Sequence, residues 1–259
     1  MVIFIAFGAM LGAALGSFAC CQAWRIRYKA EGKKDLGKRS VCLFCGRKLR
    51  WFENVPILSW IFLRGRCRGC GEKIGSAEFG SEILGAILGG LVGMKYLDRF
   101  MTGEQLWLTV VEIVLVVVIF TTMGIIAIYD GKWGEMPAKL LWVTVALSMI
   151  FAGIEIYRGS LGLVDLGISV LLLAGIYYIL YKVSKEKWVG GGDWVLCLSI
   201  SLVLGEPFLA LLELALANTL GLLLAVLRKK RGKMIPMGPA LVIAGAIIFS
   251  FSDFLMNMI

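Results

Sequence analysis

Long apolar segments separated by short polar stretches account for most of this chain. A helix needs about 20 consecutive apolar residues to cross a bilayer, and eight segments are candidates. The sixth is the shortest, and the second carries Glu82 among its glycines. The segments cover residues 2–24, 80–97, 106–129, 138–157, 161–181, 194–206, 207–227 and 238–257. The pattern predicts an all-α polytopic membrane protein with about eight transmembrane helices.

Composition agrees with this prediction. The chain is 59% hydrophobic and 17% charged, with a mean hydropathy of +0.85. A soluble domain usually carries about 25% charged residues, so an ordinary soluble domain is excluded. The sequence predicts three parts: a first transmembrane helix over 1–24, a basic loop module over 25–79, and a membrane domain over 80–259.

The basic loop sets the predicted orientation. Residues 25–79 hold 14 of the 27 lysines and arginines but only five acidic residues, so their net charge of +9 equals that of the whole chain. Basic residues remain on the cytoplasmic side of short loops, so the loop is predicted to be cytoplasmic and the N-terminus to lie outside. Residues 130–137, 182–192 and 228–233 then face the cytoplasm as well. Anionic lipid headgroups account for this charge, and no nucleic-acid partner is expected.

Glycines recur at every fourth position on the first two apolar segments. Such stripes allow helix backbones to approach closely in lipid, although this spacing also arises by chance in membrane helices. Because the two stripes flank one loop, the first two helices are predicted to pack as a pair. The stripes consist of Gly8, Gly12 and Gly16 on the first segment and of Gly85, Gly89 and Gly93 on the second.

The loop between these helices contains two Cys-x-x-Cys pairs, Cys42 with Cys45 and Cys67 with Cys70, separated by 21 residues. A glycine follows each pair, as expected for a tight turn that directs two thiolates to one ion. Four thiolates suit tetrahedral Zn²⁺ in a closed, structural site. Two disulfides are the alternative, which a reducing cytoplasm disfavours.

Asp193 follows the triplet Gly190-Gly191-Gly192 at the start of the sixth apolar segment. Three glycines in a row predict a backbone with positive φ or one that another segment approaches closely. The simplest role for Asp193 is to cap the helix that follows.

A second aspartate, Asp130, ends the third apolar segment, and Pro137 follows seven residues later. Counting membrane crossings places Asp130 and Asp193 in the same cytoplasmic plane, which favours a functional pair. Two neighbouring carboxyl groups share one proton and titrate together. The chain has no histidine, which excludes Ser-His and Cys-His catalysis. Because Asp193 begins a helix and Asp130 ends one, we expect Asp193 to be ionised and Asp130 to hold the proton.

These features together resemble the bacterial type IV prepilin peptidases, which are GxGD-type intramembrane aspartic proteases, over nearly the whole chain. The four-Cys spacing, Tyr129-Asp130 with Pro137, and Gly190-Gly191-Gly192-Asp193 are similar to the family's motifs. Val195 departs from the pattern, which usually has a lysine there. The resemblance extends to Leu15-Gly16-Ser17-Phe18 with Arg25, Glu53-Asn54-Val55-Pro56-Ile57-Leu58-Ser59-Trp60, Leu63-Arg64-Gly65-Arg66-Cys67, and Ile235-Pro236-Met237-Gly238-Pro239.

The resemblance implies a bacterial inner-membrane aspartic endopeptidase that removes the N-terminal leader of prepilins or pseudopilins at the cytoplasmic face. Asp130 and Asp193 would activate water, and the metal site would hold structural zinc. Many members also methylate the new N-terminus with S-adenosylmethionine, and Glu53, Arg66 and Glu82 are candidates for that site or for substrate contacts. The alternatives are a peptidase without methylation, a non-catalytic zinc-bearing scaffold of a pilus or secretion system, and a different intramembrane aspartic protease.

Overall fold

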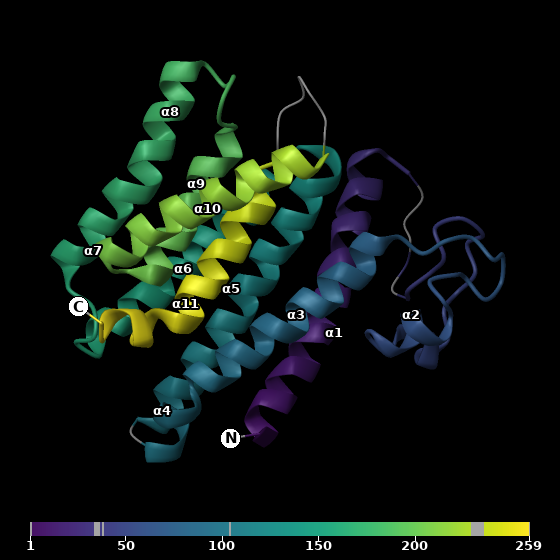
Figure 1. The fold of residues 1–259 in the computed structure, drawn as a ribbon, viewed down its shortest axis with the longest axis horizontal. Helices are drawn as coiled ribbons and strands as arrows, with labels where there is room; N and C mark the ends of the chain where they lie inside the picture. Colours follow the sequence, from purple (N-terminus) through teal and green to yellow (C-terminus); the bar gives the residue numbers. More distant parts are fainter. Residues whose placement is uncertain (1, 34–36, 38, 104, 229–235, 259) are drawn as a thin grey trace. The chain divides into compact units, whose positions relative to one another are not determined.

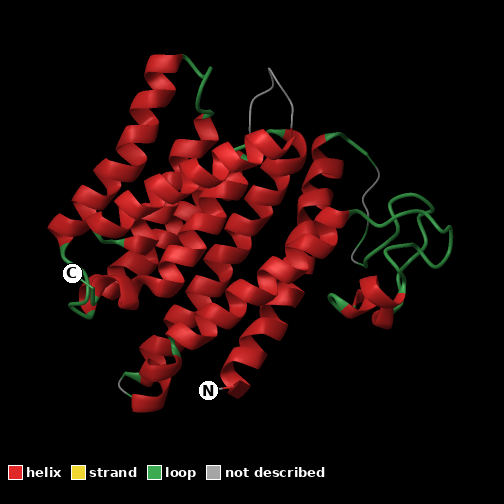
Figure 2. Ribbon diagram, viewed as in Figure 1, coloured by secondary structure: helices red, strands yellow, loops and turns green. Residues whose placement is uncertain are grey.

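A computed structural model describes residues 2–33, 37, 39–103, 105–228 and 236–258. The predicted basic connection 228–233 and Ile235 lie largely outside these residues. Helices joined by turns make up the described chain, which contains no strand (Figures 1 and 2). The all-α prediction is therefore confirmed. The chain divides into two compact units, Met1–Leu97 and Asp98–Ile259.

The first unit is a long helical pair with a loop module between its two helices. α1 and α3 pack along each other, and the module contains only short helices. The elements are α1 (Val2–Ala30), η1 (Trp51–Asn54), α2 (Leu58–Phe62) and α3 (Ser76–Lys95).

The glycine stripes bring the backbones of α1 and α3 into contact. A Cβ atom on Gly12 would lie well within 3.0 Å of the carbonyl oxygen of Gly85, and one on Gly8 would lie equally close to that of Gly89. Real Cβ atoms do not approach backbone oxygens this closely, so only glycine fits at these crossings. The predicted packing of the first two helices is confirmed.

Replacing Gly12 by Leu is expected to force α1 and α3 apart and to lower stability, because no flexible side chain can move aside. The measurement is the thermal unfolding midpoint of the purified full chain in detergent. Ala14→Leu adds a larger side chain at an exposed position of the same helix and is the matched control. Equal midpoints for the two variants would contradict the close packing.

The second unit is a bundle of membrane-length helices. α4 (Leu97–Thr102) begins at the boundary between the units. A π-helical turn, η2, joins α7 and α8 into one apolar segment over Leu163–Ser184. The remaining elements are α5 (Leu106–Trp133), α6 (Ala138–Tyr157), α7 (Leu163–Val170), η2 (Leu171–Gly175), α8 (Ile176–Ser184), α9 (Gly191–Leu204), α10 (Pro207–Arg228) and α11 (Gly238–Met256).

Seven helical segments of the described chain are long and apolar enough to cross a membrane. The predicted segment that is missing from these seven is the sixth, 194–206, which corresponds to α9 with only 14 residues. At about 1.5 Å per residue, α9 is about 21 Å long and shorter than the hydrocarbon core of about 30 Å. Its ends are fixed by Gly190, which lies in an extended conformation, and by Gly205 at φ 73°.

α9 nevertheless forms the centre of the second unit. It packs against α6, α11 and η2, and Leu196, Cys197 and Ile200 are buried on it. The start of α9 is therefore held by neighbours on several sides. This is where the sequence placed its second candidate catalytic residue.

Candidate active site and metal centre

Asp130 lies in the last turn of α5, as predicted, and is buried. Its Oδ2 accepts a hydrogen bond of 2.8 Å from the backbone N–H of Gly238, the first residue of α11. α5 ends at Gly134, whose φ of 70° is left-handed and therefore favours glycine. The side chain of Asp130 thus connects the end of one helix to the start of another.

Asp193 lies in the first turn of α9 and is also buried. Its Oδ2 accepts a hydrogen bond of 2.8 Å from the backbone N–H of Gly190, the residue that precedes the helix. The N-cap residue is Gly190, and Asp193 is the third residue of α9, from which its side chain reaches back to the N-cap N–H as in a capping box. The prediction that Asp193 is itself the N-cap is therefore wrong, although its side chain does support the start of the helix. Capping fixes the orientation of the carboxylate and is compatible with a catalytic role.

The glycine triplet serves close approach and not positive φ. Gly190 has a φ of −75°, and none of Gly190, Gly191 and Gly192 is among the positive-φ positions of the described chain. A Cβ atom on Gly192 would lie 2.6 Å from Sδ of Met136. The first of the two predicted reasons for the glycines is wrong, and the second holds.

Met136 links the surroundings of the two aspartates. Besides its contact at Gly192, its Cε would lie 3.1 Å from a Cβ atom on Gly238, the residue whose N–H binds Asp130. Met136 directly precedes Pro137, which caps the start of α6. Sequence reasoning noted Pro137 and the Gly238-Pro239 pair but gave Met136 no role. The only sequence feature that pointed to Met136 was its position between the candidate catalytic residue Asp130 and Pro137.

The structure does not support the helix-dipole argument by which Asp193 was expected to be ionised and Asp130 to hold the proton. It relied on Asp130 lying at a helix C-terminus, which disfavours a negative charge. The carboxylate of Asp130 also faces the N-terminus of α11 through Gly238, and a helix N-terminus favours a negative charge. Helix dipoles therefore do not distinguish the two carboxyl groups.

The four cysteines of the loop module meet at one point. The Sγ atoms of Cys42, Cys45, Cys67 and Cys70 all lie within 4.8 Å of one another, and those of Cys42 and Cys70 are 3.9 Å apart. A tetrahedron with Zn–S bonds of about 2.3 Å has edges of about 3.8 Å, so the cluster has the dimensions of a metal site. The cysteines are free and form no disulfide in the described chain.

Each Cys pair lies on the same type of tight turn. Gly46 and Gly71 donate their N–H groups to the carbonyl oxygens of Cys42 and Cys67, and their φ angles of 69° and 73° require glycine. The prediction of tight turns after each pair is confirmed. Backbone N–H groups of Cys70 and Gly69 point at the sulfur of Cys67 and lower the pKa of this thiol to about 6, which favours the thiolate that a metal needs.

Glu53 is buried in the module and holds two parts of it together. Its carboxylate pairs with Arg47 at 2.8 Å and accepts the backbone N–H of Arg50 at 2.7 Å. The guanidinium of Arg47, followed by that N–H, keeps the pKa of Glu53 below its ordinary value of 4.5. Arg47 belongs to the turn that carries the first Cys pair, so Glu53 supports the metal site from outside.

A Glu53→Gln variant is expected to be less stable than the parent at neutral pH. Because the folded-state pKa is lowered, the pair's contribution is present above the ordinary pKa and is lost as pH falls through the lowered value. The difference in thermal midpoint between parent and variant should therefore be constant at pH values well above 4.5 and should shrink as the pH falls below 4.5. Glu72→Gln, at an exposed position of the module, is the control. A pH-independent difference would contradict the role of the carboxylate.

Glu82 and Arg66 make separate contacts. Glu82, buried on α3, accepts the backbone N–H of Ile57 at 2.7 Å. The φ of Ile57 is 64°, which is strained for a β-branched residue, so Glu82 holds the loop in an unfavourable conformation. Arg66 is exposed and donates to the carbonyl oxygen of Gly71. Glu53 and Glu82 thus already bind protein groups, whereas Arg66 lies at the surface.

Comparison with known proteins finds relatives that span most of the chain. Residues 10–96 match the N-terminal domain of bacterial A24 peptidases. A prepilin leader peptidase/N-methyltransferase of Aeromonas hydrophila is 30% identical over 219 residues, which are 83% of this chain and 72% of that protein. That of Dichelobacter nodosus is 29% identical over 218 residues, covering 82% and 71%. That of Vibrio cholerae is 26% identical over 263 residues, covering 95% and 96%. No solved structure matches the chain.

Proposed function

Because the chain belongs to the prepilin leader peptidase/N-methyltransferase family, we propose that Asp130 and Asp193 are its catalytic pair. The observation that carries this proposal is their matching environment. Both side chains are buried, and each accepts one backbone N–H at a helix start. Met136 lies close to Gly192, which precedes Asp193, and to Gly238, whose N–H binds Asp130. Buried carboxylates are costly in a membrane protein, so two with the same support favour a shared role.

In the proposed mechanism the pair holds one proton. The ionised carboxylate removes a proton from a water molecule, and the protonated carboxyl donates a hydrogen bond to the scissile carbonyl oxygen. Water attacks the carbonyl carbon and forms a tetrahedral intermediate. Its collapse breaks the C–N bond as the amine receives a proton from the pair. The N–H groups of Gly190 and Gly238 keep the two carboxylates in place during these steps.

The proposed substrate is the N-terminal leader of a prepilin or pseudopilin. The relatives are prepilin leader peptidases by name, and the chain is a multi-pass membrane protein of the same kind. We place the aspartates and the four-Cys module on the cytoplasmic face of the inner membrane, with the N-terminus outside, on the distribution of lysine and arginine. A substrate helix could then stay in the lipid while its leader reaches the site.

The metal centre is proposed to be a structural zinc site. Its four thiols have the spacing of a tetrahedral Zn²⁺ site, and four protein ligands leave no position open for a substrate. When bound, the ion would connect the two Cys turns of a module that otherwise has only short helices. Membrane lipids are expected to contact the apolar surfaces of α1 and α3, the two helices that flank the module.

Methylation of the new N-terminus is the second proposed activity. S-adenosylmethionine, when bound, would supply the methyl group. Of the three candidate residues, Arg66 is exposed and could bind the carboxylate of S-adenosylmethionine. Glu53 and Glu82 are buried and hold the backbone of the loop module through Arg50 and Ile57. All three lie in the first unit, so methylation is assigned to that unit and cleavage to the second.

The proposed function is tested by co-expressing the full chain with a prepilin-like substrate and measuring the substrate's intact mass and N-terminal fragments. Loss of the leader only when the chain is present is the expected result, together with one added methyl group on the new terminus. Cells without the chain are the control. A leader that stays intact with several different prepilins would favour the scaffold alternative.

A further inference from the structure

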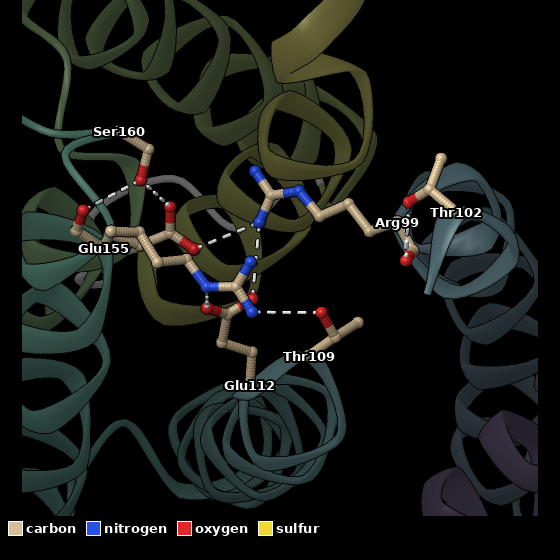
Figure 3. A network of polar contacts seen from close by, with 7 residues as sticks. Arg99, Thr102, Thr109, Glu112, Glu155 and Ser160 are labelled. Atoms are coloured by element: carbon tan, nitrogen blue, oxygen red, sulfur yellow. Dashed lines mark hydrogen bonds and ion pairs between the residues drawn. The ribbon is translucent and has the colours of Figure 1, made fainter. Parts of the chain in front are cut away.

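A polar cluster lies in the second unit, far from the catalytic pair. It joins α4, the start of α5 and the end of α6 through Arg99, Glu112, Glu155 and Arg158 (Figure 3). Glu112 precedes Asp130 by 18 residues on the continuous helix α5, which corresponds to about 27 Å along the axis. This separation is close to the thickness of the hydrocarbon core. The cluster therefore lies near the opposite membrane surface from Asp130.

The two carboxylates of the cluster are bound to its two guanidinium groups. Nη1 of Arg99 lies 3.3 Å from both Glu112 and Glu155. Nε of Arg158 lies 2.6 Å from Glu112, in an ion pair that is not aligned as a hydrogen bond, and its Nη2 donates to Thr109. Figure 3 shows the carboxylates of Glu112 and Glu155 pointing toward the guanidinium group of Arg99. The fully buried Glu112 is thus compensated from two sides.

A cavity of about 550 Å³ opens beside this cluster. Of the residues that the structure describes, five line it, and every one carries a hydrogen-bond donor. Glu112 and Glu155 are not among them. The lining consists of Arg99, Thr102, Gln105, Arg158 and Ser160.

This lining favours an anion with several oxygens. Guanidinium groups bind phosphate and carboxylate oxygens through paired N–H donors, and the amide of Gln105 adds further donors. The hydroxyl groups of Thr102 and Ser160 already donate to the carbonyl oxygen of Arg99 and to Glu155. A cation would find no carboxylate in the described lining. Gln105 has a left-handed conformation with φ of 45°, which is uncommon for a residue other than glycine. The backbone therefore holds the amide of Gln105 at the cavity at some energetic cost.

Two exposed aromatic residues that are close in sequence to the lining residues indicate the depth of the site in the membrane. Trp107 follows Gln105 by two residues, and Tyr157 directly precedes Arg158. Both are exposed, at 67% and 77%. Tryptophan and tyrosine with such exposure are typical of the level of the lipid headgroups. The anion available at that depth is the phosphate of a lipid, whose acyl chains could lie against these rings.

We propose that this cavity binds a phosphate group between Arg99 and Arg158, at the membrane surface opposite the catalytic pair. The phosphate belongs to a lipid headgroup or to free phosphate, and both offer the same oxygens to the two guanidinium groups. Phosphate binding at this site is proposed independently of the peptidase activity. A bound phosphate would connect α4, α5 and α6 at one end of the bundle.

The test is the thermal unfolding midpoint of the purified full chain in detergent, measured with phosphatidylglycerol, with inorganic phosphate, or with diacylglycerol. Diacylglycerol has the same acyl chains but no phosphate. A ligand that binds the folded state raises the midpoint, here by about 5 °C at saturation. The expected result is a rise with phosphatidylglycerol and none with diacylglycerol. An equal rise with inorganic phosphate would assign the site to the free ion.

Two variants test the location of the site. Gln105→Glu has the same size and leaves the three ion pairs of the cluster unchanged, but it adds a negative charge to the lining, so it should remove most of the shift. Arg99→Lys keeps the charge and loses the paired donors, and should weaken phosphate binding about tenfold. Lys139→Gln, at an exposed position of the same unit, lowers the net charge by one as Gln105→Glu does, and should leave the shift unchanged.

Three results would overturn the proposal. The first is that neither phosphate compound moves the midpoint of the parent. The second is that diacylglycerol gives the same shift as phosphatidylglycerol, which would indicate acyl-chain binding alone. The third is that Gln105→Glu retains the shift of the parent, which would place the binding elsewhere.

Discussion

Replacing Asp193 by Asn is expected to reduce leader cleavage by at least about a thousandfold, because an amide can neither accept a proton from water nor share one with Asp130. The change preserves size, and the amide oxygen can still accept the N–H of Gly190. The helix cap should therefore remain, and the loss should be chemical. The measurement is the rate of leader removal from a prepilin in detergent, followed by mass spectrometry.

Asp130→Asn should give a loss of similar size, because each member of a shared-proton pair is needed. Asp253→Asn, which changes an exposed aspartate of the same unit, is the matched control and should cleave at the parental rate. Unchanged thermal midpoints would show that the variants are folded. An Asp193→Asn protein that cleaves within about threefold of the parent would remove Asp193 from the catalytic machinery.

Replacing Cys67 by Ser is expected to abolish stoichiometric zinc binding and to unfold the loop module. Cys67 is the buried member of the cluster and receives backbone N–H groups that favour its thiolate. Zinc sites of this type contribute about 10–16 kcal/mol in small zinc-binding peptides, far more than the short helices of this module could supply. The measurement is zinc content per protein chain by atomic emission, combined with limited proteolysis of the module.

Cys21→Ser, at a cysteine outside the cluster, is the matched control and should retain zinc. Because the methylation candidates lie in the first unit and the aspartates in the second, loss of zinc should reduce methylation more than cleavage. Quantifying the two products on one substrate separates these effects. A Cys67→Ser protein that keeps one zinc per chain, or a parent that binds none, would contradict the assignment.

Local sequence features predicted those parts of the structure that depend on neighbouring residues. The hydropathy pattern located the long helices, and the two Cys-x-x-Cys pairs located the metal cluster. The glycine stripes predicted the contact between α1 and α3, because a missing side chain has the same effect wherever two membrane helices cross. The sixth apolar segment was predicted to be the shortest, and α9 has only 14 residues.

Contacts between distant segments could not be predicted in this way. Asp130 and Gly238 are 108 residues apart, and no local pattern indicates that one binds the other. This contact changed the electrostatic interpretation of Asp130. The pairing of Glu112 with Arg99 and Arg158 likewise depends on how three helix ends meet, which no local pattern around Glu112 indicates.

The most direct test of the catalytic pair is the pH dependence of leader cleavage by the parent chain, measured as kcat/KM on a synthetic prepilin. A pair that shares one proton predicts a bell-shaped profile. The rate should fall at low pH, where the base is protonated, and at high pH, where the acid has lost its proton. A profile with a single limb would contradict the account, because only one titrating group would then be needed for cleavage.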